Sequence, residues 1–341
     1  MIFIPAKSKL FFHMKILKIL SILFLIIALG SCKEEIEEYA EYKEKPHYIT
    51  NPTPAQKEYF EAYDKTLQKW GVEYDELYIP TSKGIAHVTL SGPKNGVPVL
   101  LLHGMSASST MWYPNAKALA EDYRLFAVDL LIEPGKSYKN ADLENLDEVI
   151  TWYQEILWAL KLDSYHLIGT SRGGWLATSL AMNSKRDIRS MILLGPVQTF
   201  EWIPPSKGML KNILNVFYSK EKRVDRSLEA FSADPNKLDE NYVDQYRIAN
   251  ENDTLNKFLI QMKPFSNDDL QTLKMPVLVL VGDDDMFSTQ KTIKITEKHL
   301  PRGKGEIISN AGHFLTVDQA QVVNEKMLNF LRNVDANRKE N

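Results

Sequence analysis

One serine in this chain is placed to act as a nucleophile. Ser171 is the centre of the run Gly-Thr-Ser-Arg-Gly at residues 169–173, which has the pattern G-x-S-x-G. The apolar residues before it are typical of a strand, and those at 175–181 are typical of a helix. Such a tight turn strains the serine backbone and needs small neighbours, which Gly169 and Gly173 provide. The pattern predicts a serine hydroxyl above a helix N-terminus, whose dipole favours developing negative charge.

A serine hydroxyl is a weak nucleophile, so this chemistry also needs a base within hydrogen-bond reach and an acid that orients the base. Where such a serine turn is used for hydrolysis, the acid follows the serine along the chain and the histidine comes last. The strand-like run at 277–281 is followed by Asp283, Asp284 and Asp285, and a later loop contains His313. The order of residue types therefore agrees with a Ser-Asp-His triad and leaves three candidates for the acid.

These residues resemble the α/β-hydrolase superfamily, and the resemblance covers about residues 75–332. It implies that the acid falls three residues after the glycine of a Gly-x-x-Asp turn, which selects Asp285. It also implies that the base is the histidine of a Gly-His-Phe turn, which selects His313. Asp283 and Asp284 are then expected to cap the turn or to face solvent.

The resemblance extends to the end of an earlier strand. Residues 103–105, His-Gly-Met, match the oxyanion loop of the family. This implies that the backbone amides of Met105 and Arg172 stabilise the negative oxygen of a tetrahedral intermediate. His103 is expected to support this loop rather than to act on the substrate.

Two features depart from the family pattern. The loop at 129–137 is one residue longer than the usual Asp-x-x-Gly-x-Gly-x-Ser and has one glycine fewer, which weakens analogies about the substrate. Arg172 stands where smaller or apolar residues are frequent. Its side chain is expected either to point into the pocket toward a carboxylate or to fold outward onto an acidic partner.

Other polar residues are expected to be structural. His87 lies in a hairpin strand and His166 in the strand before the serine, so neither is expected to act on the substrate. No group of His, Cys, Asp and Glu residues has the spacing of metal ligands, so the sequence predicts neither a metal nor a cofactor.

Strand-like and helix-like runs alternate through most of the chain, which predicts βαβ units and a mostly parallel sheet that begins with an antiparallel hairpin. Residues 200–270 interrupt this alternation and are rich in aromatic side chains, which predicts a helical cap inserted after the strand that follows the serine helix. The expected class is the α/β-hydrolase fold. The expected strands are 73–79, 85–90, 97–102, 123–130, 165–168, 189–195, 275–281 and 306–309, and the main expected helices are 55–69, 146–160, 175–181 and 316–331.

The overall composition is that of a soluble globular protein. The 341 residues include 41 Lys and Arg against 44 Asp and Glu, a net charge of −3, which makes no electrostatic case for nucleic-acid binding. The single cysteine excludes a disulfide within the chain.

The N-terminal segment has the features of a secretory signal. Lys15 and Lys18 precede an apolar run at 19–29 that is short for a membrane span. A start at Met14 would give a more typical signal peptide than a start at Met1, and the sequence leaves both starts open. Leu-Gly-Ser-Cys, which ends at Cys32, resembles a bacterial lipobox. This implies a lipoprotein held in the bacterial cell envelope by a lipid on Cys32, the alternatives being an uncleaved anchor or an ordinary buried cysteine.

The sequence therefore divides into a lipoprotein signal peptide at 1–32, a flexible charged tether at 33–54 and an α/β-hydrolase domain at 55–341. The expected activity is hydrolysis of small to medium carboxylic esters in an apolar pocket, with a small-molecule ester as the partner. The alternatives are a proline iminopeptidase, a lactonase or a carbon–carbon bond hydrolase with the same triad, or a ligand-sensing receptor with slow turnover.

Overall fold

The computed structural model describes residues 38–203, 220–251 and 261–340. The chain divides into two units, residues 1–40 and residues 41–341, and the second contains the features described below. Cys32 and the signal-like segment lie outside the described residues, so the predictions made for them stay predictions. Within the described part, no helix has the length and apolar character that a membrane crossing requires.

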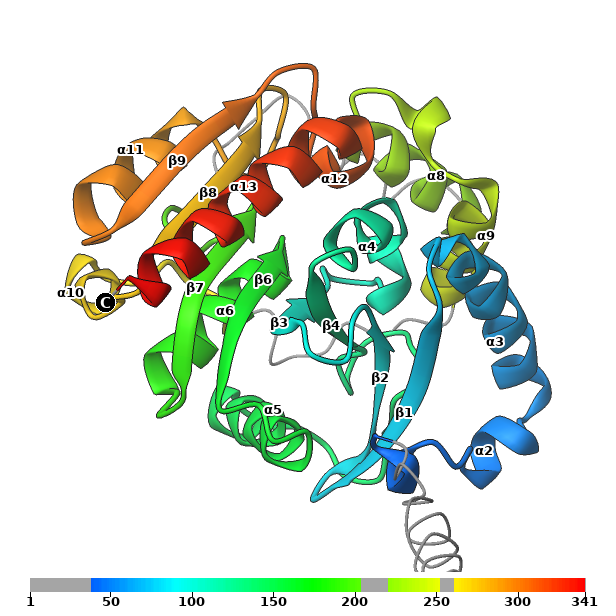
Figure 1. Cartoon of the computed structure of the whole chain (residues 1–341). Coiled ribbons are helices and arrows are strands. Elements are labelled where there is room, and N and C mark those ends of the chain that lie inside the picture. The colour runs from blue at the N-terminus through cyan, green and yellow to red at the C-terminus, as the bar shows by residue number, and fades with distance from the viewer. Residues whose placement is uncertain (1–37, 204–219, 252–260, 341) are drawn as a thin grey trace, which may run out of the picture. The chain divides into compact units, whose positions relative to one another are not determined.

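The centre of the molecule is a sheet of nine strands in the order β1-β2-β4-β3-β6-β7-β8-β9, with β5 paired to β2 (Figure 1). The pairs β1–β2 and β2–β4 are antiparallel, and from β4 through β3 to β9 every neighbouring pair is parallel. This confirms the expected hairpin followed by a parallel sheet. The strands are β1 Tyr74–Thr81, β2 Gly84–Ser91, β3 Val97–Leu102, β4 Tyr123–Val128, β5 Tyr138–Lys139, β6 Ser164–Thr170, β7 Asp187–Leu194, β8 Val277–Gly282 and β9 Gly303–Ile308.

Helices connect the strands and cover the sheet. The helices α4 and α13 contact each other, and so do α5 and α6. The described helices are α2 His47–Thr50, α3 Pro54–Leu67, α4 Tyr113–Leu119, α5 Leu146–Ala159, α6 Arg172–Asn183, α8 Lys220–Phe231, α9 Glu240–Glu251, α10 Asn267–Gln271, α11 Gln290–His299, α12 Leu315–Asp318 and α13 Ala320–Lys339, with short 3₁₀ turns at Ala40–Tyr42, Gln68–Trp70, Ser109–Trp112 and Pro235–Lys237.

The apolar runs form strands that are buried on both faces. In β3, Val99 and Leu101 join the core that contains side chains of α4 and α13. Leu100 and Leu102 are equally buried and point to the opposite face, because side chains alternate along a strand. This two-sided burial explains why the strand is a continuous aliphatic run rather than an alternating one.

The sheet topology brings the candidate residues to one edge. Because β6, β7, β8 and β9 are parallel neighbours, their carboxyl ends lie at the same edge of the sheet. The serine turn follows β6, the aspartate turn follows β8, and the histidine loop follows β9. Residues that are more than 100 positions apart in the sequence are thereby placed side by side.

The insertion after β7 includes two described helices, separated by a short irregular segment with one 3₁₀ turn. It contains α8 and α9, which contact each other, and α9 also packs against α3 near the N-terminal side of the domain (Figure 1). The apolar side chains Val224, Leu228, Tyr242 and Tyr246 connect these helices to the core.

Part of the segment expected to be a flexible tether is folded instead. Residues 47–50 form α2, and the ring of Tyr48 stacks on Tyr138 with 4.6 Å between the ring centroids. The Tyr48 hydroxyl donates a 2.8 Å hydrogen bond to the carbonyl oxygen of Lys136, and Lys43 pairs with Asp75. These contacts could not be predicted from the charge-rich composition, because each depends on a partner far along the chain.

Candidate active site

Ser171 lies in the sharp turn between β6 and α6. Its φ of 53° and ψ of −122° are rare for a residue with a side chain. The Ser171 amide donates a 2.8 Å hydrogen bond to the carbonyl oxygen of Leu194. A Cβ on Gly169 would lie 2.3 Å from the carbonyl oxygen of Gly173, and a Cβ on Gly173 would lie 2.3 Å from that of Leu102. Close backbone approach therefore requires glycine on both sides of the serine.

His313 lies in the loop between β9 and α12, and its ring connects two other side chains. Its Nε2 is 2.9 Å from Oγ of Ser171, and its Nδ1 is 3.0 Å from Oδ2 of Asp285. Because an ionised carboxylate can only accept, the ring proton belongs on Nδ1, and Nε2 is left to accept from the serine hydroxyl. The structure thus places both Ser171 and Asp285 within hydrogen-bond distance of His313.

Asp285 is held by the backbone of its own turn. Its Oδ1 accepts hydrogen bonds from the amides of Phe287 at 2.8 Å and Ser288 at 3.3 Å. The carboxylate is buried, and its second oxygen is turned toward His313. Both features favour a fixed acid that orients the imidazole.

The two neighbouring aspartates have different surroundings. The carboxylate of Asp283 accepts from the amides of Asn310 at 3.0 Å and Ala311 at 3.1 Å, and these hydrogen bonds lower its pKa. The Asp284 amide donates to the carbonyl oxygen of Ala311 at 3.0 Å, while its side chain is exposed. Asp283 and Asp284 therefore fasten the β8 turn to the loop that carries His313.

Gly195, directly after β7, leaves space for the Asp285–His313 pair. Its φ is 50°, in the left-handed region. A Cβ on Gly195 would lie 2.9 Å from Oδ2 of Asp285 and 3.1 Å from Nδ1 of His313. A side chain at this position would press on the hydrogen bond between the two.

Aromatic rings enclose the imidazole of His313. Phe231 from the cap and Phe287 from the aspartate turn meet it edge-on, with 5.9 Å and 4.8 Å between ring centroids. Phe314 also packs on Phe231 at 5.4 Å. These rings limit the access of water to the imidazole.

The histidine loop is also fastened to the cap. The carboxylate of Asp318 accepts from the amides of Gly312 at 2.8 Å and Ala233 at 2.9 Å, and it accepts from the hydroxyl of Ser232. The carbonyl oxygen of Phe231 accepts a 2.7 Å hydrogen bond from the Phe314 amide. Movement of the end of α8 would therefore displace the His313 loop.

The end of β3 approaches the serine turn from the other side. A Cβ on Gly104 would lie 3.3 Å from the Cβ of Ser171, and the side chain of Met105 is half exposed above them. His103 supports this segment, because its Nδ1 is bonded to the carbonyl oxygen of Gly104 at 2.8 Å and its Nε2 accepts from the amide of Leu130 at 2.9 Å. Burial lowers the pKa of His103, which agrees with a neutral ring that both donates and accepts.

Arg172 is buried and paired within the chain. Its guanidinium Nη1 is 2.5 Å from Oε1 of Glu133, and both side chains are almost fully removed from solvent. The residue also forms part of the pocket wall. Neither expected orientation of the Arg172 side chain is confirmed in full. The guanidinium has an acidic partner within the chain, but that partner is buried and does not lie on the outside of the protein.

A pocket of about 180 Å³ opens above Ser171 and His313. Its wall combines apolar side chains of the cap with apolar side chains of the sheet domain, and Gln198 is among the polar residues that also line it. The apolar lining agrees with the expectation from the aromatic content of the cap. Its side chains include Met105, Met111, Val197, Ile203, Phe231, Tyr242, Tyr246, Met262, Phe287 and Phe314.

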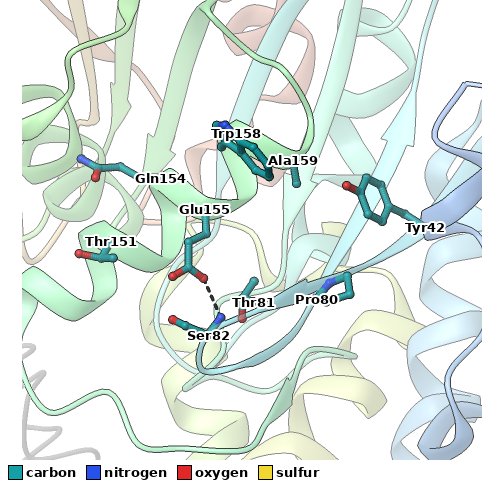
Figure 2. A pocket seen from close by; sticks show the side chains of 9 residues that line it. All are labelled: Tyr42, Pro80, Thr81, Ser82, Thr151, Gln154, Glu155, Trp158 and Ala159. Carbon is teal, nitrogen blue, oxygen red and sulfur yellow. Dashed lines mark hydrogen bonds between the residues drawn. The ribbon is translucent and has the colours of Figure 1, made fainter.

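A second hollow lies apart from these residues, between the β1–β2 turn and α5 (Figure 2). It measures about 590 Å³, and Trp158 on its border is 75% exposed. The amide of Ser82 donates a 2.8 Å hydrogen bond to Glu155 across it. None of its residues lines the pocket above Ser171, so it has no assigned part in the chemistry.

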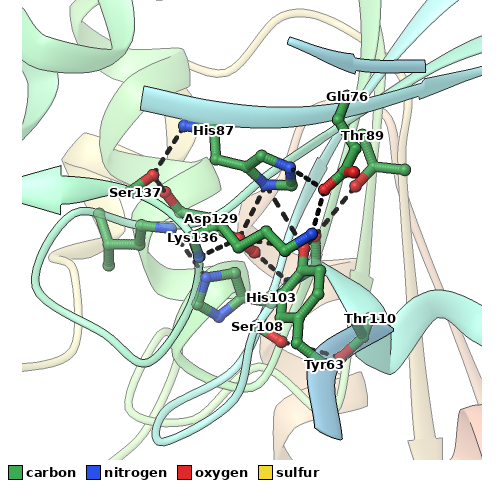
Figure 3. A network of polar contacts seen from close by, with 12 residues as sticks. Tyr63, Glu76, His87, Thr89, His103, Ser108, Thr110, Asp129, Lys136 and Ser137 are labelled. Atoms are coloured by element: carbon green, nitrogen blue, oxygen red, sulfur yellow. Dashed lines mark hydrogen bonds and ion pairs between the residues drawn. The ribbon is translucent and has the colours of Figure 1, made fainter. Parts of the chain in front are cut away.

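His87 belongs to a buried polar network, away from Ser171 (Figure 3). Its Nδ1 is 2.9 Å from Asp129 and its Nε2 is 3.0 Å from Glu76. Asp129 also accepts from the hydroxyl of Tyr63 at 3.0 Å and the amide of Lys136 at 2.8 Å. Burial opposes the charge of Asp129, but these hydrogen bonds and the His87 charge outweigh it and lower the pKa of Asp129 to about 2.

His166 is also structural. Its Nδ1 is bonded to the hydroxyl of Ser190 at 2.7 Å, and its Nε2 is 3.3 Å from Asp335 on α13. Neither His87 nor His166 lines the pocket, which agrees with the expectation for both. Among the described residues, no group of three His, Cys, Asp or Glu side chains is arranged to hold a metal ion.

Sequence reasoning did not single out Glu133, Asp318 or Gln198. Glu133 had one available signal, because it lies in the loop that departs from the family pattern. Asp318 and Gln198 had none, because their contacts with the histidine loop and the pocket depend on tertiary structure.

The fold and the arrangement at this edge define a hydrolase of the α/β class. A family model described as "Alpha/beta hydrolase family" matches residues 99–326, and the chain belongs to this family. Within it the chain is carboxylesterase-like. It is 26% identical to carboxylesterase YbfK of Bacillus subtilis over 288 residues, which cover 80% of this chain and 93% of that protein.

Two further comparisons agree. The chain is 28% identical to an uncharacterized carboxylesterase, nap, of Bacillus subtilis over 281 residues, 80% of this chain and 91% of the relative. The crystal structure of naproxen esterase from Bacillus subtilis superimposes with a TM-score of 0.75 at 27% identity, and covers 82% of this chain and 99% of that one. These matches confirm the fold class.

Proposed function

We propose that this protein is a serine carboxylesterase in which Ser171, His313 and Asp285 form the catalytic triad. The observation that carries the proposal is the continuous set of hydrogen-bond distances from Asp285 through His313 to Ser171, at the base of an apolar pocket. The carboxylesterase relatives support the reaction class.

In the first half of the reaction, the Oγ of Ser171 attacks the ester carbonyl carbon while Nε2 of His313 takes the serine proton. Asp285 holds the ring in the required tautomer and stabilises the imidazolium. When the tetrahedral intermediate collapses, the bond to the alcohol oxygen breaks and His313 passes its proton to the alcohol. An acyl-enzyme on Ser171 remains.

In the second half, a water molecule takes the place of the alcohol. His313 removes a proton from the water, the hydroxide oxygen attacks the acyl carbon, and the bond to Oγ of Ser171 breaks as the proton returns to the serine. The net reaction converts ester and water into acid and alcohol.

The backbone amides of Met105 and Arg172 are proposed to bind the oxyanion. Arg172 is the first residue of α6, and amides in the first turn of a helix have no partner within the helix. Gly104 brings the Met105 segment close to Ser171 on the other side. Donors fixed before the reaction stabilise the developing charge at little reorganisation cost.

The small apolar pocket supports esters with short to medium acyl groups as substrates. The test is a series of p-nitrophenyl esters of increasing acyl length, with Ser171→Ala as the control at each length. We expect kcat/KM to pass its maximum at a short or medium chain and then to fall. A maximum at the longest chains would contradict this pocket assignment.

Assays of other substrate classes beside the ester series, again with Ser171→Ala as the control, separate the alternatives. Turnover of proline amides, lactones or carbon–carbon substrates without turnover of simple esters would favour another reaction of the same triad. Rapid acylation followed by very slow release would favour a ligand-sensing receptor.

We also propose that the chain is a bacterial lipoprotein anchored through Cys32. The support is the lipobox-like sequence and the position of the only cysteine. Metabolic labelling of the full chain with an alkyne fatty acid should mark the wild-type protein and leave Cys32→Ser unmarked. Equal labelling of both would contradict the proposal.

A further inference from the structure

Glu133 lies in the loop between β4 and β5, where the sequence departs from the family pattern, and its side chain is only 4% exposed. A buried carboxylate is costly unless its oxygens are paired. Each oxygen of Glu133 has a partner, and the two partners belong to two different segments around Ser171.

The first partner is the backbone next to Met105. Oε2 of Glu133 accepts a 2.5 Å hydrogen bond from the amide of Ser106. Ser106 has a φ of 54°, which is unfavourable for a residue with a side chain. The hydrogen bond to Glu133 therefore stabilises a strained turn immediately after the proposed oxyanion donor.

The second partner is Arg172, whose own amide is the other proposed donor. Its Nη1 lies 2.5 Å from Oε1 of Glu133. Apart from this ion pair, the guanidinium nitrogens of Arg172 have no polar partner in the described part of the chain, so the ion pair is the contact that compensates the buried charge. The carboxylate thus connects the turn after β3 to the first residue of α6.

We propose that Glu133 is a positioning residue that sets the distance between the two amides of the oxyanion hole. The proposal rests on the function proposed above, because the hole matters only if Ser171 forms a tetrahedral intermediate. Oxyanion donors act only within a narrow range of distances from the negative oxygen, and a small displacement of one amide lowers the rate. A single carboxylate that fastens both segments is a direct way to prevent such a displacement.

The competing explanation is that Glu133 only neutralises Arg172. The two explanations differ for the double variant Glu133→Leu with Arg172→Met, which replaces the ion pair by apolar side chains of similar size and leaves no buried charge. Neutralisation alone predicts normal activity for this variant. Positioning predicts reduced activity, because Ser106 has lost its acceptor and the two segments are no longer connected.

The readouts are kcat, KM and the inhibition constant of a trifluoromethyl ketone, whose adduct with serine places an oxyanion in the hole. For the double variant we expect kcat to fall roughly 10- to 100-fold, KM to change little, and the inhibitor to bind more weakly by a similar factor. Wild-type values of kcat and inhibition constant would overturn the positioning role.

A matched control exists at the opposite ends of the strands. Asp335 pairs with Arg189 at 2.7 Å and is also mostly buried. The double variant Asp335→Leu with Arg189→Met should change thermal stability without changing kcat or inhibitor binding. An equal loss of kcat in this control would show that any lost ion pair slows the enzyme, and would overturn the specific role of Glu133.

A third variant keeps the proposal testable if the first does not fold. Glu133→Gln preserves the shape of the side chain but loses the ion pair, and its kcat should fall about 10-fold or more at unchanged KM. An unchanged kcat would overturn the proposal. If the wild-type chain shows no turnover that Ser171→Ala abolishes, the proposed function and the positioning role are both overturned.

Discussion

At the residue scale, three consecutive aspartates have three different tasks. Asp285 is directed at His313, Asp283 accepts from two amides of the histidine loop, and the side chain of Asp284 is exposed. The difference arises from the backbone turn, because residues with the same side chain leave β8 in different directions.

This difference predicts unequal effects of the same substitution. Asp285→Asn should lower kcat roughly 10³- to 10⁴-fold, because the amide no longer holds the imidazole in the required tautomer. Asp283→Asn should leave kcat within a few fold, because its contacts only fasten the loop. Steady-state kinetics of the two purified variants make the comparison.

Asp284→Asn is the matched control, with an exposed side chain and no contact with His313. A large loss of kcat in Asp283→Asn, with Asp285→Asn close to wild type, would show that the acid had been assigned to the wrong residue.

The serine and the histidine could be predicted from local sequence, because each lies in a short pattern with its own backbone requirement. The choice among the aspartates needed the family pattern, since all three follow the same strand. Glu133 could not be predicted as a contact of Ser106, because the pairing joins residues 27 positions apart across a loop.

At the element scale, the end of β7 has a precise requirement. Gly195 has a positive φ, and a Cβ there would meet Asp285 and His313 at about 3 Å. The strand is central in the sheet and well buried, so it is not expected to move away from the added atom.

We therefore expect Gly195→Ala to lower kcat roughly 10- to 100-fold while KM changes little, because the displaced imidazole no longer lines up with Ser171. Kinetics on a short-chain ester, with circular dichroism to verify folding, are the measurement. A folded variant with normal kcat would show that the Asp285–His313 pair tolerates a shift of this size.

The strands could be predicted from their aliphatic runs, and most of their bounds differ from expectation by a few residues. The C-terminal helix is longer than expected and is divided at Gln319, where the backbone leaves the helical region at φ −131°. The fold of residues 47–50 was missed, because tertiary contacts rather than composition stabilise it.

At the scale of the whole molecule, the network around Asp129 joins distant parts of the chain. Tyr63 comes from α3, Glu76 from β1 and His87 from β2, while Asp129 and Lys136 belong to the loop after β4 (Figure 3). This is the loop that carries Glu133. The network is therefore expected to stabilise the domain and to anchor the loop beneath the oxyanion segment.

The His87 contacts predict a dependence of stability on pH. Burial alone would lower the pKa of His87, but its hydrogen bonds to Asp129 and Glu76 and their charges outweigh burial and raise the pKa above the ordinary value of 6.5. A group with a raised pKa in the folded state stabilises the protein fully below its ordinary pKa, and this contribution is lost as the pH rises through the folded-state value.

His87→Gln should therefore lower the free energy of unfolding by about 1–3 kcal/mol, with the larger loss at about pH 5.5 and the smaller at about pH 9. Urea unfolding of both proteins at the two pH values gives the difference. Taking the difference removes the contributions of His103 and His166, whose pKa values burial lowers. A loss that grew with pH would contradict the charged form of His87 in the fold.

The proposed function depends most on whether Ser171 is an activated nucleophile. The direct measurement is labelling of the full chain with a fluorophosphonate probe, followed by mass spectrometry of the modified peptide, with Ser171→Ala as the control. If Ser171 is activated, the wild-type protein is labelled rapidly at Ser171 and the variant is not labelled. A folded wild-type protein that is not labelled, or labelling that persists in Ser171→Ala, would contradict the proposed function.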